Sequence, residues 1–123
     1  FDNITTEEIT TIKAVDIVIP DGITKIGSGA FMGIKSLRTV KSNGTIEQVS
    51  YSPFDGCTNL EYIDFSNQTV VPEVQVYKSW GIAKVPHIVP DELYDKWVST
   101  GYWTGIADYI IKKSDWDAQQ AAE

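Results

Sequence analysis

The chain contains a repeated unit, which first reads Ile23-Thr-Lys-Ile-Gly-Ser-Gly-Ala-Phe-Met-Gly-Ile-Lys-Ser-Leu-Arg-Thr-Val40. It returns without a gap as Ile46-Glu-Gln-Val-Ser-Tyr-Ser-Pro-Phe-Asp-Gly-Cys-Thr-Asn-Leu-Glu-Tyr-Ile63, twenty-three positions further along the chain. The period places Phe31 on Phe54 and Leu37 on Leu60. A fixed period of this length is typical of a solenoid, in which each repeat is one turn that buries its apolar side against its neighbours.

The same spacing extends the pattern outward to four segments. They begin at Ala14, Leu37, Leu60 and Ala83. Each segment follows the order apolar-x-x-apolar-x-apolar, with Ser42 and Pro86 as the two exceptions. Alternation of this kind predicts a short strand with one side facing the core. We therefore expect an α/β solenoid, a leucine-rich repeat of about four turns with a short parallel sheet. Phe31 and Phe54 should occupy equivalent buried positions in it.

The repeats are expected to form one domain together with two terminal segments. Residues 14–89 make the predicted solenoid. Residues 1–13 are predicted to be an N-terminal cap, in which Ile9 and Ile12 face the first strand. Because these two apolar residues lie three positions apart and would pack on that strand, the segment should cover the open end of the solenoid.

Residues 90–123 are predicted to form a C-terminal helical cap and a tail. Asp91 follows a proline and precedes apolar residues at helical spacing, so a helix should start there and end at Gly101. The apolar run 106–111 predicts a second short helix. The polar tail from Ser114 to Glu123 is expected to fray, apart from Trp116.

Bulk composition excludes several classes of function. The chain has 123 residues, a net charge of −7 and a pI near 4.6, and its ten basic residues are scattered, which argues against nucleic acid as a partner. No apolar run approaches about 18 residues, so we expect no membrane insertion. Cys57 is the single cysteine and cannot form an internal disulfide. A chain that begins at Phe1 rather than Met suggests a piece of a longer protein, whose neighbouring repeats would then be partners.

The outward residues of the predicted strands are the candidate ligand-binding face. In a solenoid with parallel strands these residues form ladders on one side, which is often the binding side. The candidates are Asp16, Thr39, Lys41, Tyr62, Asp64 and His87, with Val18 and Val85 between them. Tyr62 stands out because tyrosine offers a large contact area at little entropy cost. The alternative is a solvated ladder without a ligand.

The sequence contains no convincing catalytic or metal-binding signature. His87 is the only histidine, and no cysteine or second histidine lies at zinc-ligand spacing, so His87 is interpreted as a surface strand residue. No serine or cysteine nucleophile can be placed with it and a carboxylate. We expect no enzyme, no cofactor and no metal.

Aromatic residues near the C-terminus allow two interpretations. At helical spacing beside the last repeat they are most simply core residues of the cap. Among these aromatic residues, Trp80 and Trp116 are expected to be exposed. Exposed tryptophans would make the chain a glycan-binding module.

The repeat resembles the BspA-type (treponemal) leucine-rich repeat, Ile-x-x-Ile-Gly-x-x-Ala-Phe-x-x-Cys-x-x-Leu-x-x-Ile. Residues 23–40 match it except for Ile34 in place of cysteine, and residues 46–63 keep Cys57 but carry Ser50 and Pro53 instead of glycine and alanine. Residues 89–97 and 102–112 are similar to the closing segment of many such proteins of gut bacteria and their phages.

This resemblance implies a non-enzymatic module of a secreted or surface-displayed bacterial protein. Members of the family are associated with adhesion to host matrix proteins and to other bacteria, so the implied ligand is a protein or a glycan. Similar repeats occur in prophage virion proteins. A structural module of a virion fibre or tail decoration is therefore the alternative, with the virion rather than the cell surface as its location.

Overall fold

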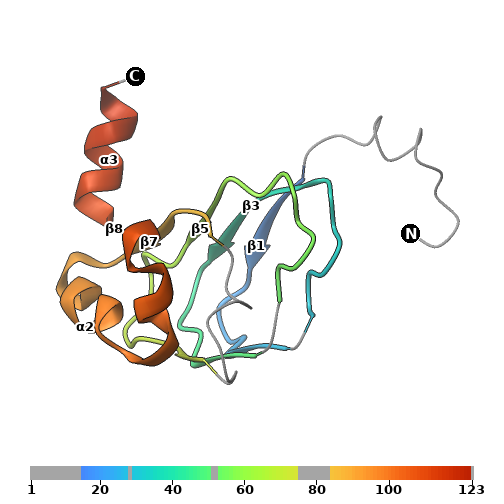
Figure 1. Ribbon diagram of the computed structural model, residues 1–123, viewed down its shortest axis with the longest axis horizontal. Helices are drawn as coiled ribbons and strands as arrows, with labels where there is room; N and C mark the ends of the chain where they lie inside the picture. Colours follow the sequence, from blue (N-terminus) through green and yellow to red (C-terminus); the bar gives the residue numbers. More distant parts are fainter. Residues whose placement is uncertain (1–14, 28, 51–52, 75–83, 123) are drawn as a thin grey trace, which may run out of the picture.

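The structure is a computed structural model that describes residues 15–27, 29–50, 53–74 and 84–122. Its elements, in order, are β1 (Val15–Ile19), β2 (Lys25–Ile26), β3 (Leu37–Ser42), β4 (Gln48–Val49), β5 (Tyr62–Asp64), β6 (Glu73–Val74), β7 (His87–Val89), η2 (Asp91–Leu93), α2 (Tyr94–Val98), η3 (Gly101–Tyr109), β8 (Ile110–Lys112) and α3 (Lys113–Ala121) (Figure 1). The predicted N-terminal cap (1–13) and Trp80 lie outside the described residues.

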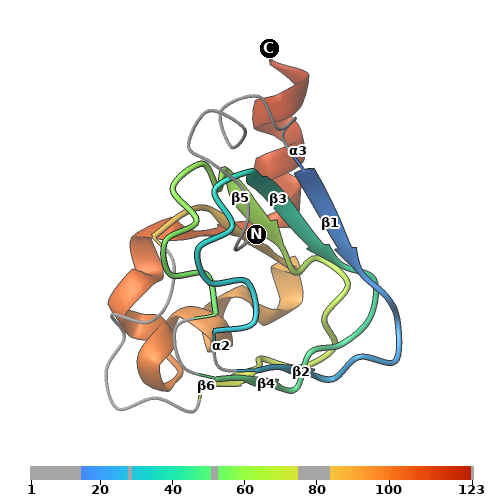
Figure 2. The same ribbon diagram turned by 90° about the vertical axis from the view of Figure 1, so that its right-hand side faces the viewer.

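The strands form two sheets, and every strand pair in both is parallel. The larger sheet has the order β1-β3-β5-β7-β8, and the smaller has the order β2-β4-β6. The chain passes from one sheet to the other and back, and Figure 2 shows the sheets on separate sides of the molecule with turns between them. The parallel sheet expected from the repeat is therefore present.

The period of twenty-three residues sets the register of the first three strands of the larger sheet. Thr39 pairs with Asp16 on one side and with Tyr62 on the other. Phe31 and Phe54 stack with ring centroids 5.3 Å apart and ring planes only 4° apart. The prediction that these two rings occupy equivalent positions in successive turns is confirmed, but only Phe54 is buried and Phe31 is half-buried.

The register changes by one residue between β5 and β7. Ile63 pairs with His87 and Asp64 with Ile88, a separation of twenty-four. Because a slip of one residue moves every side chain of a strand to its other side, His87 faces the core and Ile88 faces outward. Both are buried, at 1% and 0% exposure. The expected arrangement, with Ile88 inside and His87 outside, is wrong.

The smaller sheet was not expected from the sequence. Each of its strands has two residues, and the second of each pair, Ile26, Val49 or Val74, aligns with the others. Ile26 and Val49 belong to the buried core and Val74 packs against it. The aligned polar residues of the other row, Lys25, Gln48 and Glu73, lie on the opposite side of these strands.

The C-terminal segment differs in part from its prediction. The helix after Asp91 is present as η2 and α2, but 106–111 is not a helix. Its first residues end η3, and Ile110 begins β8, a fifth strand that puts Ile110 beside His87 in the core. The expected frayed tail is the helix α3. An apolar run next to a free sheet edge gains more burial as a strand, which explains β8.

Two tryptophans join this segment to the core. Trp97 and Trp103 are buried, with ring centroids 5.3 Å apart, and both contact Phe65. The Trp103 indole donates a hydrogen bond of 2.8 Å to the carbonyl oxygen of Pro72. In the described part of the chain, no helix is long and apolar enough to cross a membrane.

Candidate functional site

The outer side of β1, β3 and β5 places most of the predicted site residues in two rows. We call this surface the strand face. The first row is Asp16, Thr39 and Tyr62, and the second is Val18, Lys41 and Asp64. Since paired residues of a parallel sheet point to the same side, the structure brings five of the six predicted site residues together.

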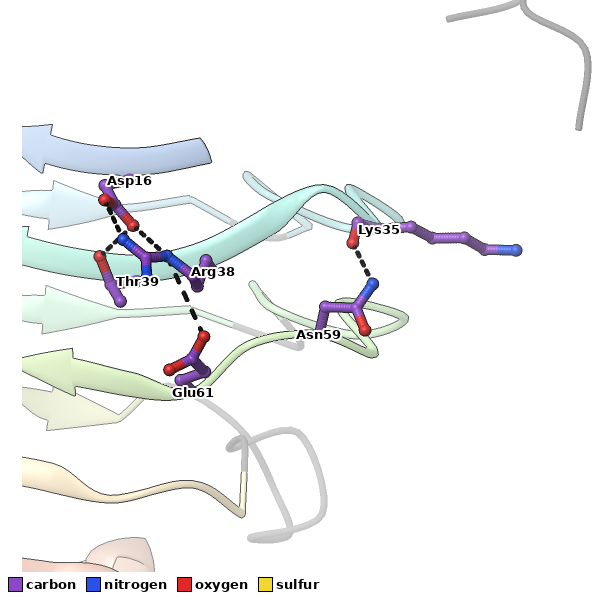
Figure 3. Close-up of polar contacts among 6 residues, drawn as sticks. All are labelled: Asp16, Lys35, Arg38, Thr39, Asn59 and Glu61. Atoms are coloured by element: carbon purple, nitrogen blue, oxygen red, sulfur yellow. Dashed lines mark hydrogen bonds and ion pairs between the residues drawn. The ribbon is translucent and has the colours of Figure 1, made fainter. Parts of the chain in front are cut away.

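Arg38 holds the first row in a fixed arrangement (Figure 3). The Arg38 guanidinium donates two hydrogen bonds to the Asp16 carboxylate, at 3.0 and 2.6 Å, and the Thr39 hydroxyl donates a third at 2.8 Å. The Arg38 hydrogen bond, and then that of Thr39, holds the pKa of Asp16 below its usual range. The Arg38 pKa is raised, mainly by the same bond to Asp16. Two parallel bonds of this kind fix geometry as well as charge.

A β-bulge explains why Arg38 can reach Asp16. Val15 pairs with Leu37 but Asp16 pairs with Thr39, so Arg38 is an extra residue in the longer strand. Bulges redirect a side chain in this way. Arg38 also lies 4.0 Å from the Glu61 carboxylate on the next turn, and the array therefore spans three turns of the repeat.

Sequence reasoning missed Arg38, Glu61 and Asn59. Arg38 and Glu61 are twenty-three positions apart, and this opposite-charge pair at one repeat position was a usable signal. The Asn59 side chain donates a hydrogen bond of 2.7 Å to the backbone carbonyl of Lys35, whereas the Lys35 amine points away from it (Figure 3). Asn59 therefore ties two turns together at the rim of the strand face.

The second row is more open than the first. Val18 is 53% exposed and Lys41, its partner in the sheet, is also exposed. Within the described residues, Lys41 forms no ion pair, unlike Arg38. The strand face thus has one cation that is already neutralised and one that is available to a ligand.

Tyr62 and Asp64 lie at the C-terminal end of the strand face, where α3 approaches. The Tyr62 and Trp116 ring centroids are 5.0 Å apart, with planes at 56°. One Asp64 carboxylate oxygen accepts a hydrogen bond of 2.8 Å from the Ser66 backbone amide. Trp116, expected to be exposed, is half-buried by this contact.

His87, the sixth predicted site residue, does not belong to the strand face. It lies between Phe65 and Trp103, and its Nδ1 is 2.6 Å from the carbonyl oxygen of Val85. Burial lowers the His87 pKa to about 4. The interpretation of His87 as a surface residue is therefore wrong, because the longer third turn directs it inward.

Neither metal binding nor thiol chemistry has a built site in the part of the chain that the structure describes. No group of three or more His, Cys, Asp or Glu residues is close enough there to hold a metal ion. The Cys57 thiol donates a hydrogen bond of 2.9 Å to the Phe31 carbonyl oxygen, and burial raises its pKa. A thiol with a raised pKa is a weak nucleophile.

Comparison with models of protein families matches residues 3–83 to the BspA type leucine rich repeat region, in six copies. The match includes β1 through β6 and ends before β7. The comparison with curated proteins and the comparison with solved structures gave no match.

Proposed function

Because the chain belongs to the BspA-type leucine-rich-repeat family, we propose that it is a non-enzymatic binding module of a secreted or surface-displayed bacterial protein. The module recognises a protein or glycan ligand through the strand face and serves adhesion. Its repeats form a solenoid of about four turns, which keeps the strand face ordered. The C-terminal elements close one end of that solenoid as a helical cap.

The Asp16–Arg38 array beside the open Val18–Lys41 pair is the observation that supports this proposal most directly. Arg38 is held by two hydrogen bonds from its guanidinium to one carboxylate. A surface whose side chains are already ordered loses little conformational entropy when it binds. Val18 then offers an apolar contact, and Lys41 offers a charge that a ligand can pair.

The charge of the chain bears on the kind of ligand. A net charge of −7 repels nucleic acid and anionic lipid surfaces. A protein with a carboxylate for Lys41, or a glycan, remains compatible with a single open cation on the strand face. The proposal therefore excludes nucleic acid and membrane insertion.

A charge reversal on each sheet tests the proposal. The full chain, Lys41→Glu and the matched control Lys25→Glu are each measured against a panel of matrix proteins, bacterial surfaces and a glycan array. Lys25 is exposed on the smaller sheet, away from the strand face, so both variants carry the same change in net charge.

We expect Lys41→Glu to weaken binding by about tenfold, which corresponds to about 1.4 kcal/mol. Lys25→Glu should bind like the unaltered chain. Equal losses in the two variants would show a response to net charge alone, and unchanged binding by Lys41→Glu would remove the strand face from the proposal. Binding to the glycan array would identify the ligand as a glycan, and binding to the matrix proteins would identify it as a protein.

A further inference from the structure

α3 approaches the strand face with one aromatic side chain. The helix follows β8 without a loop and projects from the end of the molecule opposite β1 (Figure 1). Trp116 is half-buried against Tyr62, with 5.0 Å between the ring centroids. Trp116 therefore covers a residue of the strand face that a ligand would otherwise contact.

The outward side of the sheet carries a buried apolar residue at β7, in contrast to the polar rows on β1 and β3. The register change after β5 turns Ile88 outward, next to Asp64, and Ile88 is nevertheless fully buried. α3 lies next to β7 and β8. The outer side of the sheet consequently has an open polar part and a covered apolar part.

α3 also carries one basic residue, Lys113, in its first turn. Lys113 and Trp116 are three positions apart, so they share one side of the helix. The pKa of Lys113 is raised, first by its hydrogen bond to Asp117 and, more weakly, by the nearby carboxylate of Asp64. The Trp116 ring on Tyr62 therefore covers one of the residues that sequence analysis assigned to ligand binding.

The attachment of α3 is slight. Residues 114–122 are all exposed apart from the half-buried Trp116, and none of the helix is fully buried. The Ser114 amide donates one hydrogen bond of 3.0 Å to the Asp91 carboxylate, and the Lys113–Asp117 ion pair is internal to the helix. Segments with so few buried apolar contacts open locally while the rest of the protein stays folded.

We propose that α3 is a displaceable occupant of the strand face, and that the partner is a polypeptide helix which carries an exposed aromatic side chain. The partner helix replaces α3 on Tyr62. This inference rests on the proposed function, since it specifies the ligand as a protein and gives the same site a closed state. A ligand that binds only the open state has an apparent affinity equal to its intrinsic affinity multiplied by the fraction of chains that are open.

A peptide copy of α3 is the probe. It spans residues 113–123 and carries a fluorophore and a lactam between Asp115 and a Gln119→Lys substitution, because a helix this short is marginal in water. Its binding is measured by fluorescence anisotropy to three full-length chains: the unaltered chain, Trp116→Ala, and the matched control Gln119→Ala. Gln119 is exposed, so its loss should leave α3 in place.

The Trp116→Ala chain should bind the peptide at about tenfold lower concentration than the other two, which is about 1.4 kcal/mol. A peptide that itself carries Trp116→Ala should bind none of them. Equal binding to all three chains, including no binding to any, overturns the inference.

Hydrogen exchange on the same chains gives a readout that needs no ligand. α3 amides of the unaltered chain should exchange faster than those of β5, and Trp116→Ala should accelerate α3 alone. Exchange of α3 only through global unfolding contradicts displacement. A chain that binds the peptide yet binds nothing in the ligand panel keeps this inference and defeats the proposed function, while the reverse result defeats the inference alone.

Discussion

The buried imidazole of His87 couples the stability of the fold to pH. Its pKa is about 4 in the folded chain against 6.5 for an unperturbed histidine, because burial disfavours the charged form. Above pH 6.5 the side chain is neutral in both states, and its contribution to stability is fully present. As the pH falls below 6.5, the unfolded chain takes up the proton first, so stability falls until about pH 4.

We predict a loss of about 3 kcal/mol over that interval from His87 alone. The measurement is the free energy of unfolding in urea as a function of pH, for the unaltered chain and for His87→Phe. Carboxylates titrate in the same range in both chains, so the difference between the two curves isolates the histidine. Parallel curves between pH 6.5 and 4 would contradict the prediction.

Trp97 and Trp103 provide a second prediction at this scale, because only one of the two indoles is hydrogen-bonded. Trp103 donates to the Pro72 carbonyl, whereas Trp97 has no partner for its Nε1 among the described residues. Trp103→Phe leaves a buried carbonyl unpaired, and Trp97→Phe removes an unpaired donor. Trp103→Phe should therefore be the less stable variant by about 1–3 kcal/mol, as measured by urea denaturation. Equal stability of the two variants would show that the Pro72 bond contributes nothing.

At the scale of the repeat element, glycines hold the turn that carries the aromatic stack. Gly33 and Gly56 occupy equivalent positions and both have positive φ, at 75° and 78°. A Cβ on Gly56 would lie 3.2 Å from the Gly33 Cα atom, so the two turns also approach closely there. The positive φ and the short distance between the two turns both require glycine at position 56.

Gly56→Ala should destabilise the fold by about 1–3 kcal/mol. The matched control is Gly27→Ala, since nothing lies within 4 Å of a Cβ at that position. Thermal unfolding followed by circular dichroism should show a lower Tm for Gly56→Ala and little change for Gly27→Ala. Similar Tm values for the two variants would mean that the turn relaxes at no cost.

The parts of the fold that the sequence predicted are those set by the short repeat period. The period read from residues 23–40 and 46–63, extended back to the segment from Ala14, predicted the pairing of β1, β3 and β5, because each turn packs on the equivalent turn before it. The smaller sheet escaped notice, since a two-residue strand such as Lys25–Ile26 has too few positions to show alternation.

The secondary structure of the last third of the chain was predicted wrongly, because tertiary contacts rather than the local sequence determine it. Residues 106–111 have helical spacing, but the edge of β7 was free to pair with Ile110 and its neighbours. α3 is polar and lacks an apolar stripe, and its start is fixed by the Asp91 carboxylate, twenty-three positions earlier in the chain. No local pattern contains either piece of information.

The positions of the candidate site residues were predicted correctly wherever the register of the strands was predicted correctly. Asp16, Thr39, Lys41, Tyr62 and Asp64 lie where the period puts them. Arg38 was missed because a bulge, rather than strand alternation, turns it outward. His87 was misplaced by the single extra residue of the third turn. Whether these residues bind a ligand stays a prediction.

At the scale of the whole molecule, the C-terminal segment should be needed for folding. Trp97, Trp103, Ile106 and Ile110 all belong to the core, and the two tryptophans pack on Phe65. A chain ending at residue 89 would leave those apolar surfaces in water. We predict that it loses cooperative unfolding, as followed by circular dichroism and a dye that binds exposed apolar surface.

The matched control is a chain ending at residue 112, which removes only α3. Because no residue of α3 is fully buried, this shorter chain should still unfold in one cooperative transition. Cooperative unfolding of the chain ending at residue 89 would mean that the repeats fold alone and that the molecule has two domains.

The longer third turn has an evolutionary implication. Relatives that gain or lose one amino acid between β5 and β7 would exchange the interior and exterior sets of the following strand in a single event. Such an insertion or deletion changes which side chains of the strand are exposed, without any substitution in the strand itself. Diversity of ligands among chains built on one repeat can therefore arise from indels in turns as well as from mutation of exposed side chains.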